Sequence, residues 1–297
     1  MNALLIILSI IVSGGLWLRF LYKYDKVEPE PIWVVLKVLF WGGILSAIPA
    51  SILNNIAQAI TGYEIQTKSS LFSTAFFALA VGINEEVCKA FATVYLTKKL
   101  MELDEPIDAV IYSTAVGLGF AVIENFEYGF QYGLLNIGLR TITAIPLHIG
   151  LAVLWGIPIA RVRFFMKLSY FEEMRGAVFL AALIHGIYDF FVFYFQIPLL
   201  SLVTSLAIAY LLVQYSDKKL KYLLGQTPFL PAGTCTNCGY ENTPEDKTCK
   251  KCGFNLTQDF FIVCSNCGTK LPSHYTTCSF CGTSVNTKSL FQEKTRD

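Results

Sequence analysis

Charged residues are scarce in this 297-residue chain. Asp, Glu, Lys and Arg together make up 15% of the sequence, whereas hydrophobic residues make up 54%. A typical globular protein carries about 25% charged residues. The composition therefore excludes an ordinary soluble protein and indicates an integral membrane protein.

The amino end lacks the marks of a cleaved signal peptide. The opening segment, MNALLIILSIIVSGGLWLRFLYKYDK, has no basic residue before its apolar run and no A-x-A cleavage site. Its basic residues follow the apolar run instead. This order predicts a retained first transmembrane helix whose amino end lies outside the cell.

Seven apolar runs are long enough to cross a bilayer, which takes roughly 20 residues. We therefore expect an all-α polytopic membrane helix bundle of about seven transmembrane helices, formed by residues 1–222 and located in the cell membrane. The runs are Leu4 to Tyr22, Ile32 to Ala59, Leu71 to Leu96, Ile107 to Phe130, Ile142 to Phe165, Gly176 to Gln196 and Ile197 to Tyr215.

Lysine and arginine are unevenly divided between the two sides of this bundle. Because these residues accumulate in cytoplasmic loops, their division predicts the orientation. With the amino end outside, the cytoplasmic tail and loops hold eleven and the external loops two. The cytoplasmic ones are Lys23, Lys26, Lys98, Lys99, Arg161, Arg163, Lys167, Arg175, Lys218, Lys219 and Lys221, and the external ones are Lys68 and Arg140.

Cysteine is nearly absent from the membrane part, and eight of the nine cysteines lie beyond Gly233. They form two copies of C-x2-C-x10-C-x2-C, a pattern that suits tetrahedral zinc. A disulfide framework is disfavoured because the orientation places the tail in a reducing compartment. We expect two structural zinc ions, held by Cys235, Cys238, Cys249, Cys252, Cys264, Cys267, Cys278 and Cys281.

The tail is predicted to consist of four segments. A linker (223–233) precedes a first zinc ribbon (234–256), a second ribbon (262–284) and a disordered end (285–297). From Gly233 to Thr283 there are four lysines and four acidic residues, so the basic surface of a nucleic-acid-binding module is missing. A cytoplasmic protein partner is the better prediction.

Ionisable residues interrupt the apolar runs at a few positions. Each costs about 2.5 to 3.5 kcal/mol near the centre of a bilayer, so such residues usually serve a function. They are Glu85, Glu86 and Lys89 in the third run, Glu124 and Glu127 in the fourth, His148 in the fifth, and His185 and Asp189 in the sixth.

Helical spacing predicts local pairs among these residues. Lys89 lies four residues after Glu85 and three after Glu86, so we expect it to neutralise one carboxylate while the other points about 100° away. His185 and Asp189 are four apart, within reach of a hydrogen bond. The predicted depths let all these groups converge in a wet pocket in the outer half of the membrane.

The chemistry that fits this set is hydrolysis. A buried carboxylate takes a proton from water while a histidine orients the water or stabilises the oxyanion. A metal held by a glutamate and the two histidines would also activate water, and the sequence does not separate the two mechanisms.

Two other functions use the same residues. An ion-coupled transporter would employ them as a proton relay, although the internal repeat typical of carriers is not evident. A non-catalytic scaffold would use the acids as structural ion pairs and the zinc ribbons to recruit a partner.

Five motifs, in this order, carry a resemblance to a known family: YDKVEPEP from Tyr24, EEVCK from Glu85, ENFEY from Glu124, PLH ending at His148 and HGIYD from His185. The set resembles the PrsW family of intramembrane proteases, which is distantly related to the CAAX prenyl protease and bacteriocin-processing group. By that likeness the candidate catalytic residues are Glu85, Glu86, His148 and His185, and the supporting residues are Lys89, Glu124, Asn125 and Asp189.

The resemblance implies an intramembrane endopeptidase that acts on membrane-anchored proteins. The family is tied to site-1 cleavage of an anti-sigma factor on the extracytoplasmic side. In the related group an arginine follows the glutamate pair and an asparagine follows the last histidine. Lys89 and Asp189 stand at those places here, which leaves the oxyanion donor unassigned.

Overall fold

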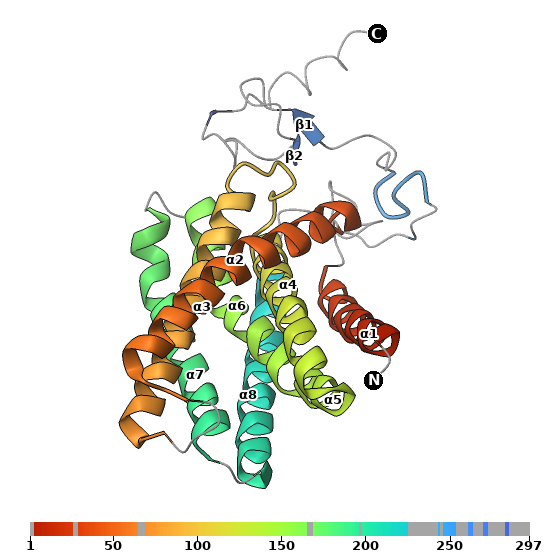
Figure 1. The fold of residues 1–297 in the computed structure, drawn as a ribbon. Coiled ribbons are helices and arrows are strands. Elements are labelled where there is room, and N and C mark those ends of the chain that lie inside the picture. The colour runs from red at the N-terminus through yellow and green to blue at the C-terminus, as the bar shows by residue number, and fades with distance from the viewer. Residues whose placement is uncertain are drawn as a thin grey trace.

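The computed structural model describes residues 3–25, 29–64, 69–164, 169–195, 198–224, 243, 246–253, 261–263, 270–272 and 283–284. Within these ranges, seven helical segments are long and apolar enough to cross a membrane (Figure 1). The predicted all-α bundle of seven transmembrane helices is confirmed.

Among the described residues of the membrane part there are eight helices. They are α1 (Ala3–Tyr22), α2 (Ile32–Thr61), α3 (Leu71–Thr97), α4 (Pro106–Tyr132), α5 (Leu134–Ile142), α6 (Ala144–Phe164), α7 (Tyr170–Tyr194) and α8 (Pro198–Leu224).

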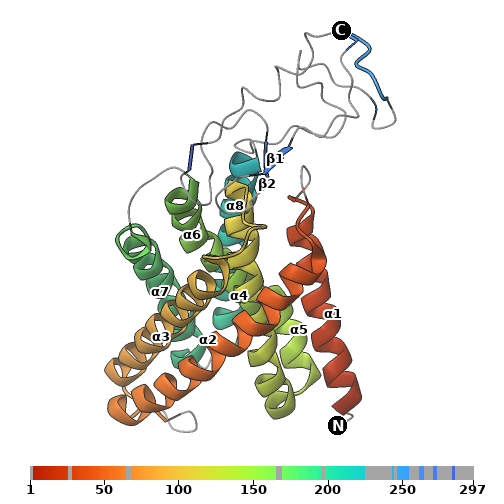
Figure 2. The ribbon, with the colours of Figure 1, turned by 90° about the horizontal axis from the view of Figure 1, so that it is seen from above.

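Helix α5 is the element that the sequence did not reveal. It has nine residues, which is too short for a span, and it continues into α6 through Thr143 alone. Together they form the fifth membrane-length segment, Leu134–Phe164. Helix α5 and the start of α1 lie at the same end of the bundle (Figure 2).

Helices α4 and α6 form the centre of the bundle. Of their most apolar stretches, 89% and 83% of the residues are buried, against 22–39% in the other five segments. The remaining helices surround this pair, and their outward faces carry large apolar side chains such as Ile60 and Phe72. This is the pattern expected where lipid replaces water as the solvent.

Local signals fix the helix ends. The side chain of Ser70 accepts a hydrogen bond from the amide of Ser73 and caps α3. Ser169 and Glu172 form a capping box at the start of α7. Gly62 ends α2 at φ +64°, a left-handed conformation that glycine adopts without steric cost.

The proline-acid segment before α2 is attached to α4. The backbone amide of Glu30 donates to Asp25 Oδ2 at 2.7 Å, and the hydroxyl of Tyr112 donates to the Glu30 carboxyl group. Burial raises the pKa of Glu30 to about 9. Helix α2 is thereby held at its start against the centre of the bundle.

Glycines allow the close helix contacts that bring the candidate catalytic residues together. Gly82 of α3 faces the backbone of α7, and Gly117 of α4 faces the carbonyl oxygen of His148 in α6. A Cβ atom at Gly117 would lie 2.8 Å from that oxygen. Small residues at such contacts are characteristic of packed transmembrane helices.

The tail contains a short antiparallel pair, β1 (Phe261–Val263) and β2 (Lys270–Pro272), with Ile262 opposite Leu271. Of the eight predicted zinc ligands, Cys249 and Cys252 lie in the described ranges. The other six fall outside them, as does all of the predicted disordered end.

Replacing Gly82 with alanine should force α3 away from α7. The added methyl group would lie 2.7 Å from the amide nitrogen of Gly186 and against the carbonyl oxygen of Ala182. We expect a loss of about 1–3 kcal/mol in stability, measured as a lower thermal unfolding midpoint of the purified chain in detergent.

Gly176→Ala in α7 is the matched control, because a Cβ there meets no atom within 4 Å. It should leave the midpoint unchanged or raise it, since alanine is the better helix former. Equal midpoints for the two variants would contradict the close contact.

Candidate active site

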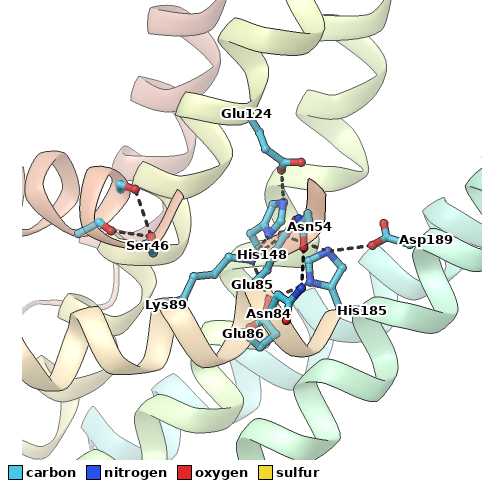
Figure 3. Close-up of polar contacts among 12 residues, drawn as sticks. Ser46, Asn54, Asn84, Glu85, Glu86, Lys89, Glu124, His148, His185 and Asp189 are labelled. Atoms are coloured by element: carbon cyan, nitrogen blue, oxygen red, sulfur yellow. Dashed lines mark hydrogen bonds and ion pairs between the residues drawn. The ribbon is translucent and has the colours of Figure 1, made fainter. Parts of the chain in front are cut away.

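The four candidate catalytic residues meet inside the bundle, where α3, α6 and α7 pack together (Figure 3). Glu85 and Glu86 come from α3, His148 from α6 and His185 from α7. All four are at least 96% buried. The predicted convergence of these residues is therefore present in the structure.

Lys89 lies at the centre of the cluster and has no exposed surface. Its ammonium nitrogen is 3.2 Å from Glu85 Oε2, 2.8 Å from Glu86 Oε1 and 2.9 Å from His148 Nδ1. It also lies 3.9 Å from the centre of the Phe120 ring. The prediction that Lys89 neutralises only one carboxylate was wrong, because its long side chain reaches between both.

The contacts of His148 define its tautomer. An ammonium group can only donate, so Nδ1 of His148 accepts from Lys89 and the proton of the neutral ring lies on Nε2. That nitrogen is 2.8 Å from Glu124 Oε2, to which it donates. Both ring nitrogens of His148 are thus committed to protein partners.

His185 has one committed nitrogen and one that faces the other acids. Its Nδ1 is 2.9 Å from Glu86 Oε1. Its Nε2 lies 3.6 Å from Glu85 Oε2 and 3.6 Å from Asp189 Oδ2, which is longer than a hydrogen bond. The four-residue spacing brings His185 and Asp189 together as predicted, without a direct hydrogen bond.

Glu124 and Asn125 are held by a residue that the sequence analysis treated only as a loop charge. Arg140 of α5 donates from Nη2 to Glu124 Oε2 at 2.9 Å and from Nε to Asn125 Oδ1 at 2.6 Å. Its guanidinium carbon also lies 4.1 Å from the centre of the Tyr128 ring. Glu124 is therefore paired with Arg140, the cation of the short helix α5.

The two neighbouring glutamates differ in how tightly they are bound. Glu86 is fully buried, and its oxygens meet Lys89, His185 and the indole N–H of Trp155, the last at 3.0 Å. Glu85 is 4% exposed and has longer contacts, all at 3.2 Å or more. Glu86 is the more rigid of the two.

Helix α2 contributes an amide that the sequence analysis did not single out. Asn54 Nδ2 donates to Glu85 Oε1 at 3.2 Å, and Asn84 Nδ2 donates to Asn54 Oδ1 at 3.1 Å. Both asparagines are partly exposed. Neither asparagine stands out in the sequence, since each is an uncharged residue within an apolar run.

Glu85, His148 and His185 fit a divalent metal by donor type and spacing. One ligand atom from each lies within 4.8 Å of the others. A carboxylate with two imidazoles is also a known set of catalytic zinc ligands. A metal ligated by His148 would, however, replace its bond to Lys89 or to Glu124.

Comparison with known sequences identifies the family of this chain. The profile of the family described as PrsW family intramembrane metalloprotease matches residues 30–215, more than half of the chain. A profile described as double zinc ribbon matches residues 235–282. The family match and the bundle of membrane-length helices together identify the chain as an intramembrane peptidase. The chain belongs to the PrsW family.

Several bacterial relatives carry the name Protease PrsW. The protein of Clostridioides difficile (strain 630) is 31% identical over 192 residues, which cover 63% of this chain and 77% of the relative. That of Oceanobacillus iheyensis is 26% identical over 202 residues (68% and 89%). That of Bacillus subtilis (strain 168) is 26% identical over 182 residues (61% and 79%). No solved structure matches significantly.

Lys89→Met should destabilise the bundle strongly. It leaves Glu85 and Glu86 buried without their shared cation, and removing one partner of a buried ion pair costs about 3–5 kcal/mol. The thermal unfolding midpoint in detergent should fall, and adding Glu86→Gln to Lys89→Met should recover part of the loss.

Lys98→Met is the control, because Lys98 is an exposed cation at the end of the same helix. It should leave the midpoint unchanged. If Lys89→Met unfolded at the wild-type temperature, Lys89 would not be the charge on which the cluster depends.

Proposed function

We propose that this peptidase hydrolyses peptide bonds of membrane-anchored proteins in or near the outer half of the bilayer, with Glu85 as the base that activates water. The observation that supports it is the meeting of Glu85, Glu86, His148 and His185 inside a bundle of membrane-length helices. Buried ionisable groups are costly in a membrane protein, and where they occur they usually serve a function.

Glu85 is the better base because its carboxylate is the less constrained one. A general base must be able to approach water and take its proton. Glu86 has three close donors and no exposed surface, so we assign it to holding Lys89 and His185 in place.

The histidines then take different roles. His148 has no uncommitted ring nitrogen and positions Lys89 and Glu124. His185 presents Nε2 towards Glu85 and Asp189, where a water or a substrate carbonyl would lie. We assign Asp189, Asn125 and Glu124 to the support of these groups.

The reaction is a hydrolysis with one proton carried by Glu85. As the water oxygen bonds to the scissile carbonyl carbon, Glu85 takes a proton from the water, and N–H donors stabilise the charge on the carbonyl oxygen. When the carbon–nitrogen bond breaks, the same proton passes to the leaving amine.

A metal is the alternative way to activate the water. Held by Glu85, His148 and His185, it would act as a Lewis acid and lower the pKa of bound water. We favour the carboxylate mechanism because the buried ammonium of Lys89 already places a positive charge against two of these three residues.

The proposed orientation places the amino end outside the cell and the zinc ribbons in the cytoplasm. It rests on the division of Lys and Arg between the two sides of the bundle. Under this orientation α5 lies at the outer end of the bundle, and the hydrogen bond from Arg140 of α5 to Glu124 supports a position of that part of the cluster in the outer half of the membrane. Site-1 cleavage of an anchored regulator suits this position.

The ribbons are proposed to hold two structural zinc ions and to engage a cytoplasmic protein. A site closed by four cysteines has no open position for water or substrate. Their contribution is therefore to folding and partner binding, and the chemistry takes place in the membrane.

Glu85→Gln should lower the cleavage rate by about 10²–10⁴-fold, the range expected for loss of a general base. The assay would co-reconstitute the purified chain in liposomes with a single-span reporter that carries an extracytoplasmic segment. Glu86→Gln should lower both the rate and the thermal unfolding midpoint.

Glu127→Gln provides a control, because Glu127 is an exposed glutamate of α4. It should cleave the reporter as the wild type does. Wild-type cleavage by both Glu85→Gln and Glu86→Gln would refute the active-site assignment and favour the scaffold function.

Metal analysis should separate the two mechanisms without an activity assay. Elemental mass spectrometry of the full chain is expected to find two zinc ions per molecule, since the tail matches a double zinc ribbon. The double variant His148→Ala/His185→Ala should retain both. A further metal ion that is lost in that variant would establish the metal mechanism instead.

A further inference from the structure

The donor for the substrate's carbonyl oxygen is the missing part of the proposed reaction. In hydrolysis, charge develops on that oxygen and must meet a fixed N–H group. Lys89 already commits one hydrogen bond each to Glu85, Glu86 and His148, and an ammonium group has three hydrogens. The single N–H of Trp155 is committed to Glu86.

Asn54 retains a hydrogen to donate. Its side-chain amide has two N–H bonds, and one of them reaches Glu85 Oε1 at 3.2 Å. The residue is partly exposed, unlike the buried donors of the cluster. Its second N–H therefore lies beside the proposed base with no competing acceptor among the contacts of the cluster.

Asn84 sets the direction in which Asn54 donates. The oxygen and nitrogen of an amide side chain are assigned from their partners. Asn84 Nδ2 donates to Asn54 Oδ1 at 3.1 Å, and the carboxylate of Glu85 accepts from Asn54 Nδ2, so the oxygen of Asn54 faces Asn84 and its NH₂ group faces Glu85. The donor is thus oriented before substrate arrives, as an oxyanion site requires.

The two asparagines also lie where a substrate could approach from the membrane. A groove of about 560 Å³ between α2 and α3 is lined by Ala57, Ile60, Thr61, Ser70, Phe72, Ser73, Phe76 and Ala80. On α2, Ala57 and Thr61 follow Asn54 by three and seven residues. On α3, Ala80 and Phe76 precede Asn84 by four and eight. Such spacings lie on one helix face, so the groove runs along the same faces of α2 and α3 that carry the amide pair.

We propose that Asn54 is a further catalytic residue, whose side-chain amide donates a hydrogen bond to the oxygen of the scissile carbonyl, and that Asn84 is the residue that positions it. This inference rests on the proposed peptidase function. It places the donor on α2. In the related group an asparagine follows the last histidine, and this chain has Asp189 at that place.

The first test is kinetic and uses the full chain in detergent. The probe is a fluorescence-quenched peptide that spans the cleavage site mapped in the single-span reporter. Asn54→Ala should lower kcat about 100-fold with KM changed less than about threefold, because the hydrogen bond forms fully only in the transition state. Asn54→Leu, of similar size and suited to an apolar helix, should do the same.

Asn55→Ala is the matched control. Asn55 is the next residue of α2, of the same type, and it is exposed on the outer face of the helix. It should keep wild-type kcat and KM. Asn84→Ala should lower kcat about tenfold, and the Asn54→Ala/Asn84→Ala double variant should match Asn54→Ala alone, since Asn84 acts through Asn54.

A second test distinguishes an oxyanion donor from a residue that merely holds Glu85. In the Glu85→Gln background, binding of a phosphonate analogue of the same peptide is measured by calorimetry. Its tetrahedral oxygens mimic the charged intermediate, so Asn54→Ala should weaken binding about 100-fold there as well. Unchanged binding would show that Asn54 acts only through Glu85.

The outcomes also separate this inference from the proposed function. If the wild type cleaves and Glu85→Gln does not, while Asn54→Ala and Asn54→Leu retain wild-type kcat, only the role of Asn54 is overturned. If the wild type fails to cleave the reporter and the peptide, both proposals fall together.

Discussion

The buried ammonium of Lys89 is the interaction on which the polar centre of this membrane protein depends. It has no exposed surface and contacts two carboxylates and an imidazole within 3.2 Å. Removing such charges from water costs several kcal/mol per ion, and only complete hydrogen bonding offsets that cost. Each of the three hydrogens of Lys89 has an acceptor, so the carboxylates of Glu85 and Glu86 share a fully hydrogen-bonded counter-charge inside the bundle.

The consequences of this contact extend across the helices. Lys89 fixes the tautomer of His148, His148 donates to Glu124, and Glu124 accepts from Arg140. This series of hydrogen bonds joins α3 to α6, α4 and the short helix α5. Interhelical hydrogen bonds of this kind contribute to holding transmembrane helices together where lipid provides no hydrophobic driving force. The same contacts that orient the reactive groups therefore also stabilise the bundle.

Much of this arrangement could be predicted from the sequence, because its signals are local. Apolar runs give the spans, and the three- and four-residue spacings place Lys89 beside both glutamates. The spacing gave directions around the helix but not the reach of a lysine side chain, so the shared contact was missed. Arg140 was missed because its nine-residue helix is too short to register as a span. Asn54 was missed because its partner lies on another helix, and nothing in the apolar run around it indicates that packing.

The asparagine pair also bears on a general difficulty of cleavage inside a membrane. A helical substrate satisfies its backbone N–H and C=O groups internally, and each unsatisfied group costs several kcal/mol in hydrocarbon. A scissile carbonyl must lose its helical hydrogen bond before water can attack it. An amide side chain offers the same donor that the carbonyl gives up, so Asn54, between an apolar groove and Glu85, can compensate the unwound carbonyl beside the base. The substrate helix is then unwound at the point where Asn54 replaces the lost hydrogen bond. The carbonyl that accepts from Asn54 is also the one aligned for attack by water.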